Sequence, residues 1–238
     1  MVPEKLARKI SSLAWESIEK ELNERGYATT GPLLNQNECI RLAAGYERDD
    51  AFRSHVIMAH HGFGKGEYKY FRYPLPDLVG SLRNALYPPL AQIANRWSTA
   101  LSHDAKYPPG HAEYLELCHS AGQPRPTPLL LKYGEGDYNC LHQDLYGDLF
   151  FPLQVAFLLS RPGEDFAGGE FVLTEQRPRM QSRVEVVALS QGEGVIFAVN
   201  QRPVQGARGV YRVAMRHGVS RLRSGSRYTL GVIFHDSK

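Results

Sequence analysis

The segment LLLKYGEGDYNCLHQDLYGDL, residues 129–149, holds the polar side chains around which we expect the fold to be organised. Side chains alternate between the two faces of an extended strand, so His142 and Asp144 project on one face and Gln143 on the other. An imidazole and a carboxylate placed side by side supply two of the ligands that a catalytic metal needs. The segment therefore predicts part of a metal site and requires a third donor from elsewhere in the chain.

We expect His217 to be that third donor. Two histidines and one carboxylate on one face of an octahedron, with the remaining positions open, form the facial triad of non-haem Fe(II) oxygenases. His-x-Asp also occurs by chance, in which case His142 and Asp144 lie at a solvated strand end. Cys140 shares the parity of His142, and we expect it to be a small wall residue rather than a ligand.

A second polar side chain stands out in the C-terminal segment RYTLGVIFH, residues 227–235. In a strand, Arg227 shares one face with Thr229, Gly231 and Ile233. An arginine among small or apolar groups is costly to bury without an anionic partner. A guanidinium matches a carboxylate through two parallel hydrogen bonds, and a dicarboxylate co-substrate supplies such a partner.

These pieces occur in an order that resembles the 2-oxoglutarate- and Fe(II)-dependent dioxygenases, most closely their prolyl-hydroxylase-like and AlkB-like branches. The resemblance covers residue 127 to the C-terminus. Its motifs, in chain order, are Lys132-Tyr133-Gly134, His142-x-Asp144, Gly168-Gly169-Glu170-Phe171, Gly194-Val195-Ile196-Phe197, His217 and Arg227-Tyr228-Thr229-Leu230.

The resemblance implies roles for particular residues. The implied Fe(II) ligands are His142, Asp144 and His217. Arg227 is implied to bind the distal carboxylate of 2-oxoglutarate, with Tyr133 and Thr229 as hydrogen-bonding helpers. Two plainer interpretations stay open for the helpers: Tyr133 as a packed strand aromatic, and Thr229 as a residue chosen for its β propensity.

From residue 127 onward the apolar pattern is typical of short strands broken by glycine. The eight expected strands are LLLKY, DYNCLHQD, FFPLQVAFLLS, GEFVLTE, RVEVVALS, GVIFAV, RVAMRH and RYTLGVIFH. Eight short antiparallel strands form a double-stranded β-helix, or jelly roll. On RVAMRH, Val213, Met215 and His217 should point inward. We therefore predict an α+β fold with a catalytic core at 127–238 and a helical support region at 1–126, both within one compact domain.

The support region shows helix signals at several places. Apolar spacing predicts a helix over 3–25 that ends at Gly26, followed by a short strand. Asn35 and Glu38 form a capping box for a helix that continues to Ala44. A helical pattern over 78–101 contains Pro88 and Pro89, where we expect one helix to end or kink and another to begin. A further helix is expected at 111–119.

Residues 54–74 predict a hairpin around the glycine-rich turn 62–66, acting as a lid. Its basic side chains, Lys65, Lys69 and Arg72, alternate with aromatic residues. Such a hairpin can stack on a base and pair with phosphates, which would make these three residues substrate contacts. The alternative is an ordinary exposed hairpin whose aromatic rings pack on the core.

Composition sets broader limits. The 238 residues are 42% hydrophobic and 22% charged, which is ordinary for a globular protein. Apolar runs are too short for a membrane helix, the N-terminus lacks the core of a signal peptide, and three scattered cysteines suit a reducing cytoplasm. Ten arginines lie between positions 177 and 227 against two glutamates, which fits either a phosphate-binding surface or a solvated rim.

The expected activity is hydroxylation of a C–H bond with dioxygen and 2-oxoglutarate. Oxidative demethylation of alkylated DNA or RNA fits a further resemblance to bacterial oxygenases thought to act on damaged nucleic acid. AlkB-type enzymes place a second arginine six residues after the first, and here that residue is Ile233. The short spacing from His217 to Arg227 is more typical of prolyl hydroxylases. Hydroxylation of a protein side chain or small molecule therefore stays open, as does a non-catalytic metal- or ligand-binding barrel.

Overall fold

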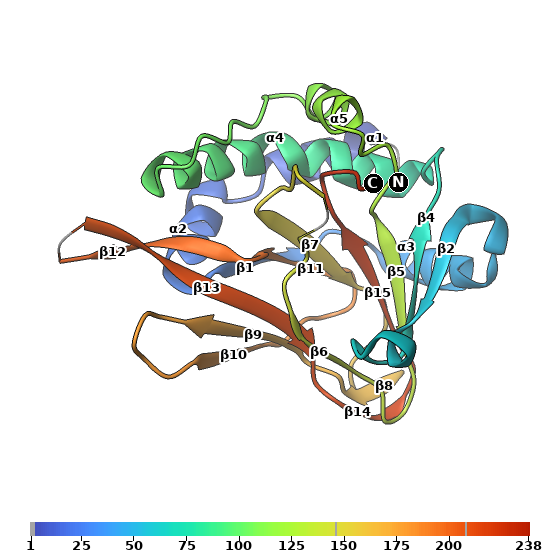
Figure 1. The fold of residues 1–238 in the computed structure, drawn as a ribbon. Helices are drawn as coiled ribbons and strands as arrows, with labels where there is room; N and C mark the ends of the chain where they lie inside the picture. The colour runs from blue at the N-terminus through green and yellow to red at the C-terminus, as the bar shows by residue number, and fades with distance from the viewer. Residues whose placement is uncertain (1–2, 146, 208) are drawn as a thin grey trace.

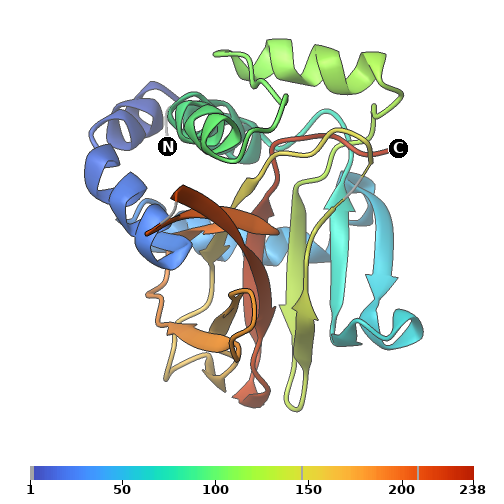
Figure 2. The ribbon, with the colours of Figure 1, turned by 60° about the vertical axis from the view of Figure 1, so that its left-hand side comes forward.

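The protein folds into two large antiparallel sheets that face each other and a small sheet of two strands, with most helices gathered along one side (Figures 1 and 2). The computed structural model describes residues 3–145, 147–207 and 209–238. A large cluster of buried apolar side chains runs through helices and both sheets, and a smaller cluster contains Met58, Tyr133, Leu158, Phe166 and Leu222. This mixed arrangement of helices and antiparallel sheets, with the core at the C-terminal half, matches the predicted α+β double-stranded β-helix.

The helices are α1 (Pro3–Ser11), α2 (Trp15–Arg25), α3 (Gln36–Ala44), α4 (Asp77–Ala100) and α5 (His111–Ser120), with short 3-10 turns η1 (Gly45–Glu47), η2 (Asp49–Ala51) and η3 (Met58–His61). The strands are β1 (Tyr27–Pro32), β2 (Phe52–Ile57), β3 (Gly64–Lys65), β4 (Glu67–Phe71), β5 (Leu129–Tyr133), β6 (Tyr138–His142), β7 (Leu153–Leu158), β8 (Phe166–Gly168), β9 (Phe171–Gln176), β10 (Arg183–Val187), β11 (Glu193–Ala198), β12 (Gln201–Gly206), β13 (Gly209–Val219), β14 (Leu222–Gly225) and β15 (Arg227–Val232).

Each of the eight predicted strands of the core is present, as β5, β6, β7, β9, β10, β11, β13 and β15. The larger sheet has the order β1-β11-β7-β15-β5-β4-β2, and the smaller has the order β10-β9-β13-β6-β3, with β12 paired to β13. Strands from the N-terminal half therefore extend the sheet of the core. The division at residues 126 and 127 stays a prediction.

Two sequence signals near the N-terminus correctly predicted where α3 begins and where α2 ends. The Glu38 amide donates to Asn35 Oδ1 at 3.0 Å, and the Asn35 amide donates to Glu38 Oε2 at 2.9 Å, which confirms the capping box. Gly26 ends α2 in the left-handed conformation at φ 82°. The single helix predicted over 3–25 is wrong, because the Ser11 and Ser12 hydroxyls donate to carbonyls of the preceding turn and the chain breaks before Trp15.

The predicted end of a helix at Pro88 and Pro89 is also wrong, since α4 continues through both, whereas a kink there stays a prediction. Two prolines in a helix interior cost roughly 6 kcal/mol together. The same helix buries Leu82, Leu86 and Leu90, each with 0% of its surface exposed. Each such side chain contributes about 1.5–3 kcal/mol, so packing against the core is large enough to offset the prolines.

The hairpin predicted at 54–74 is present as β2 paired with β4, and it extends the larger sheet. The tip of the hairpin belongs to the other sheet. There β3 pairs with β6 of the smaller sheet, which places Gly64 opposite Asn139 and Lys65 opposite Tyr138. The tip therefore bridges the two sheets at the edge where the expected metal ligand His142 lies.

Candidate active site

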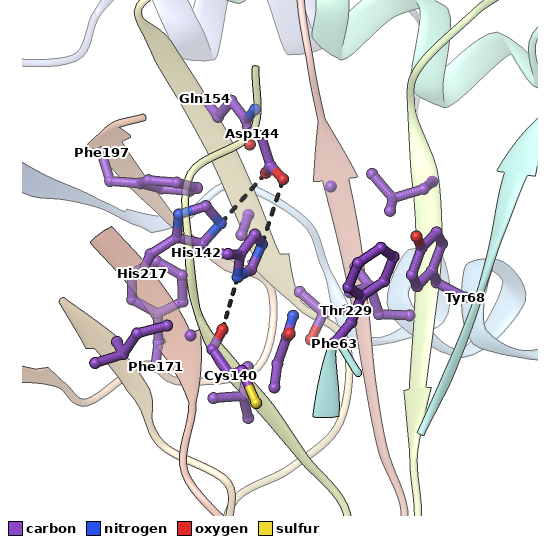
Figure 3. A pocket seen from close by; sticks show the side chains of 18 of the residues that line it. Phe63, Tyr68, Cys140, His142, Asp144, Gln154, Phe171, Phe197, His217 and Thr229 are labelled. Carbon is purple, nitrogen blue, oxygen red and sulfur yellow. Dashed lines mark hydrogen bonds and ion pairs between the residues drawn. The ribbon is translucent and has the colours of Figure 1, made fainter. Parts of the chain in front are cut away.

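Three predicted ligand side chains converge between the sheets (Figure 3). His142 Nε2 lies 3.3 Å from Asp144 Oδ1, and His217 Nε2 lies 3.3 Å from Asp144 Oδ2. One ligand atom from each residue falls within 4.8 Å of the others. The His142 Nδ1–H donates to the Cys140 carbonyl at 2.7 Å, which leaves Nε2 free to coordinate a cation.

The backbone explains how residues 75 positions apart meet. His217 on β13 is the direct antiparallel partner of His142 on β6. Val219 pairs with Asn139, so three steps on β6 oppose two on β13 and form a β-bulge. The bulge points both Asn139 and His142 inward despite their odd spacing, and Cys140 is exposed. Cys140 lines the cavity wall, as the sequence predicted, and is not in the ligand group.

The charges of the triad suit a divalent cation. Burial would raise the pKa of Asp144, but hydrogen bonds and charge from His142 and His217 hold that pKa well below 3.8. Burial lowers the pKa of His217. Burial also acts to lower the pKa of His142, but the bond to Asp144 outweighs it and the net pKa is raised. The Asp144 carboxylate is thus ionised and stabilised by the two histidines. A bound metal cation would stabilise its negative charge instead.

Arg227 is buried close to the triad, with 2% of its surface exposed. Its Nη1 donates to Thr229 Oγ1 at 2.7 Å, while its Nε has no hydrogen-bond partner among the described residues. None of the ion pairs formed within the described chain includes Arg227, and burial lowers its pKa. A guanidinium held this way needs an anion in the cavity.

The predicted helper residues lie beside Arg227. Tyr133 on β5 is the register partner of Arg227 on β15, and its ring lies 5.6 Å from the guanidinium carbon. Asn139 Nδ2 donates to the Tyr133 hydroxyl at 3.4 Å, so that hydroxyl faces the same cavity. Thr229 is 4% exposed and holds Arg227 directly. Their contact with a co-substrate stays a prediction.

A cavity of about 340 Å³ contains all of these groups, and most of its wall is apolar. Phe171 and Phe197 pack around His217, with the Phe197 ring 4.6 Å from the imidazole. Phe63 and Tyr68 lie on the opposite side of the cavity (Figure 3). Phe63 comes from the tip of the hairpin and is 48% exposed, so it lies at the mouth. The site thus combines a metal triad, a buried cation and aromatic walls.

A family model described as an oxygenase catalysing oxidative methylation of damaged DNA matches residues 66–237. The chain belongs to this oxygenase family. Two uncharacterised proteins of Mycobacterium tuberculosis, from strains CDC 1551 / Oshkosh and ATCC 25618 / H37Rv, are each 50% identical to the oxygenase over 167 residues. The match covers 70% of the oxygenase and 72% of each relative.

Solved structures share the fold of the oxygenase at low sequence identity. A Pseudomonas putida prolyl-4-hydroxylase aligns with a TM-score of 0.52 at 14% identity, covering 94% of the oxygenase and 99% of that chain. A 2OG-Fe(II) oxygenase family protein of Burkholderia pseudomallei aligns with a TM-score of 0.54 at 16% identity, covering 95% of the oxygenase and 93% of that chain. A Trichoplax adhaerens prolyl hydroxylase in complex with a hypoxia inducible factor peptide aligns with a TM-score of 0.56 at 12% identity, covering 96% of the oxygenase and 91% of that chain.

The side chains of this oxygenase fit the Fe(II) and 2-oxoglutarate that the sequence predicted. Two imidazoles and one carboxylate form the donor set that non-haem Fe(II) prefers. The buried Arg227 with its unsatisfied Nε suits one carboxylate of 2-oxoglutarate.

The three predicted substrate contacts do not form one surface. Lys69 is 6% exposed, and its Nζ donates to the Tyr46 carbonyl at 3.0 Å and to Asp49 at 2.8 Å, so its prediction as a nucleic-acid contact is wrong. Lys65 is exposed at the hairpin tip beside the cavity. Arg72 is exposed beyond the other end of β4, seven residues and roughly 20 Å along the strand from Lys65.

Several cavity residues were missed in the sequence analysis, among them Asn139, Gln154 and Phe63. No sequence signal distinguishes Gln154, because one polar residue inside a run of apolar ones is common in strands. None of the helices within the described ranges is long and apolar enough to cross a membrane.

Proposed function

We propose that this oxygenase oxidises the methyl group of an N-alkylated base in nucleic acid and thereby restores the unmodified base. The observation that carries the proposal is the aromatic-walled cavity beside the triad, large enough for a planar ring, in a chain whose family model describes action on damaged DNA. Roles in DNA repair and a location in the cytoplasm belong to the same proposal.

In this proposal His142, Asp144 and His217 bind Fe(II), and Arg227 anchors the distal carboxylate of 2-oxoglutarate, aided by Tyr133 and Thr229. Bound iron and 2-oxoglutarate supply the activation of dioxygen, with 2-oxoglutarate leaving as succinate and carbon dioxide. One oxygen atom enters the methyl C–H bond and gives N–CH₂OH. The C–N bond then breaks, formaldehyde leaves, and the nitrogen keeps the electron pair and takes up the hydroxyl proton.

The protein side chains orient the base and exclude water. A base within a duplex cannot reach a buried metal, so the target nucleotide must be extruded or already unpaired. Phe171 and Phe197 support the His217 ring, while Phe63 and Tyr68 offer π faces on the mouth side. Apolar walls keep bulk water from the reacting methyl group.

A protein side chain is the second candidate substrate. Ile233 stands where AlkB-type enzymes carry a second arginine, and it is 2% exposed and lines the cavity. The oxygenase thus lacks one charged group associated with that branch. A small-molecule substrate fits the same apolar cavity.

The test begins with anaerobic titration of Fe(II)-loaded protein with 2-oxoglutarate, followed through the visible charge-transfer band of the chelated keto acid. Oxygen is then admitted with single-stranded oligonucleotides that carry N-methylated bases, and succinate and formaldehyde are measured. Unmethylated oligonucleotides of the same sequence are the control. Formaldehyde in proportion to succinate supports the proposal. Succinate without formaldehyde from any methylated base would reject nucleic acid and leave the reaction class intact.

A further inference from the structure

Gln154 on β7 carries a buried amide to which the proposed reaction assigns no role. Its side chain is buried, with 4% of the residue exposed, and it lines the cavity beside Asp144 (Figure 3). The Nε2 amide has no hydrogen-bond partner among the described residues. A buried donor without a partner costs free energy, so the partner of Gln154 should be a group that enters the cavity.

Other amides of the cavity are already engaged. Gln143 Nε2 donates to the carbonyls of Asn200 at 3.0 Å and Met215 at 2.8 Å, which ties the Asp144 loop to the smaller sheet. Asn139 Nδ2 donates to the Tyr133 hydroxyl. Gln154 Nε2, by contrast, has no partner among the described residues and is available to a ligand.

The strand register places Gln154 at the metal end of the cavity. Thr229 pairs with Leu158 and Val232 with Val155, so the backbone of Gln154 lies six residues along β15 from the level of Arg227. Its side chain lies beside Asp144, whereas Arg227 is the predicted anchor for the distal carboxylate of the co-substrate. The group that meets the Gln154 amide is therefore part of the primary substrate or a ligand at the metal.

We propose that Gln154 is a specificity-determining residue that donates a hydrogen bond to a carbonyl oxygen next to the methylated nitrogen of the base. This inference rests on the proposed function. In 3-methylthymine both neighbours of the methylated nitrogen are carbonyls, whereas in 1-methyladenine they are an amino-bearing carbon and a C–H. The amide of Gln154 selects the first kind of base over the second.

The experiment compares wild-type protein with Q154L and Q154E on single-stranded oligonucleotides that carry 3-methylthymine or 1-methyladenine. In Q154L we expect kcat/KM for 3-methylthymine to fall at least about tenfold, with a change below about twofold for 1-methyladenine. In Q154E the carboxylate accepts rather than donates, so 3-methylthymine should fall further and 1-methyladenine should gain. Q143L, which removes an amide already bonded to backbone, should change both substrates by the same factor.

The unfolding temperature and the far-UV circular dichroism spectrum should match wild type in both Gln154 variants and show that they are folded. Equal loss on both bases, or no loss, would overturn the role in base selection. Weakened iron binding in Q154L would instead identify Gln154 as a positioning residue for Asp144, and the inference would fall. If wild-type protein releases formaldehyde from neither base, the proposed function fails and this inference fails with it.

Discussion

Replacement of Arg227 by methionine should separate two effects that the buried guanidinium has on the protein. In the absence of co-substrate, Arg227 is a desolvated cation with Thr229 as its hydrogen-bonding partner and without a carboxylate within ion-pair distance among the described residues. Exchange of an uncompensated buried charge for an apolar side chain of similar length is neutral or stabilising. We therefore expect R227M without 2-oxoglutarate to unfold at the wild-type temperature or above it.

With 2-oxoglutarate bound, wild-type protein should instead unfold at a higher temperature than R227M. Two charge-assisted hydrogen bonds to a carboxylate contribute about 3–6 kcal/mol, so their loss should weaken 2-oxoglutarate binding by roughly 10²–10⁴-fold. At a concentration of 100 Kd, 2-oxoglutarate stabilises the wild-type protein by about 2.7 kcal/mol. For a chain of this size that corresponds to a rise in Tm of about 5–11 °C. R227M should show almost none of this rise.

The assay is thermal unfolding under anaerobic conditions, with Mn(II) in place of Fe(II), over a series of 2-oxoglutarate concentrations. Metal affinity is measured in parallel and should be unchanged, because Arg227 is not among the predicted metal ligands. T229V is a matched control that keeps the guanidinium and removes only its hydroxyl partner, so it should retain most of the rise in Tm. A wild-type rise in Tm for R227M would refute the assignment of Arg227 to the co-substrate.

Three further predictions concern the ligands, the buried histidines and the hairpin. H142A, D144A and H217A should each abolish iron-dependent succinate formation while the protein stays folded. Anaerobic titration with Fe(II) checks this, and a variant that binds Fe(II) as tightly as wild type would show that its residue is not a metal ligand. Burial, together with the charge of Arg83, lowers the pKa of His111 and of His235 from 6.5 to about 4. Between pH 4 and pH 6.5 the unfolded chain therefore binds more protons than the folded chain. The contribution of each histidine to the free energy of unfolding is fully present above pH 6.5 and falls by about 1.4 kcal/mol per pH unit as pH drops toward 4. Urea unfolding at several pH values should show this slope, reduced by about half in H111Q. K69M should lower stability by about 1.5–3 kcal/mol through loss of its charged hydrogen bonds and leave DNA binding unchanged. K65Q should instead lower the salt slope of DNA binding by about one, with R72Q as the exposed control; equal slopes for K65Q and wild type would remove the hairpin tip from the interface.

The sequence by itself determined those features that depend on local backbone geometry. Strand alternation placed Val213, Met215 and His217 on the inner face of β13, and the structure buries all three. The Asn35 and Glu38 pair fixed a helix start because a capping box needs only four consecutive residues. The ordered motifs likewise identified the fold and the reaction class, since each motif has a required position along the chain.

Only the tertiary structure decided features that depend on distant neighbours. The bulge in β6 exists because β13 pairs with both Asn139 and His142, which are an odd number of residues apart. Lys69 is buried because the Tyr46 carbonyl and Asp49 meet its ammonium group, and α4 passes through two prolines because its leucines pack on the core. Gln154 lies beside the triad because β7 pairs with β11, where its register partner Phe197 packs against His217. Such outcomes follow from packing energies summed over long-range contacts, which a short window of sequence does not contain.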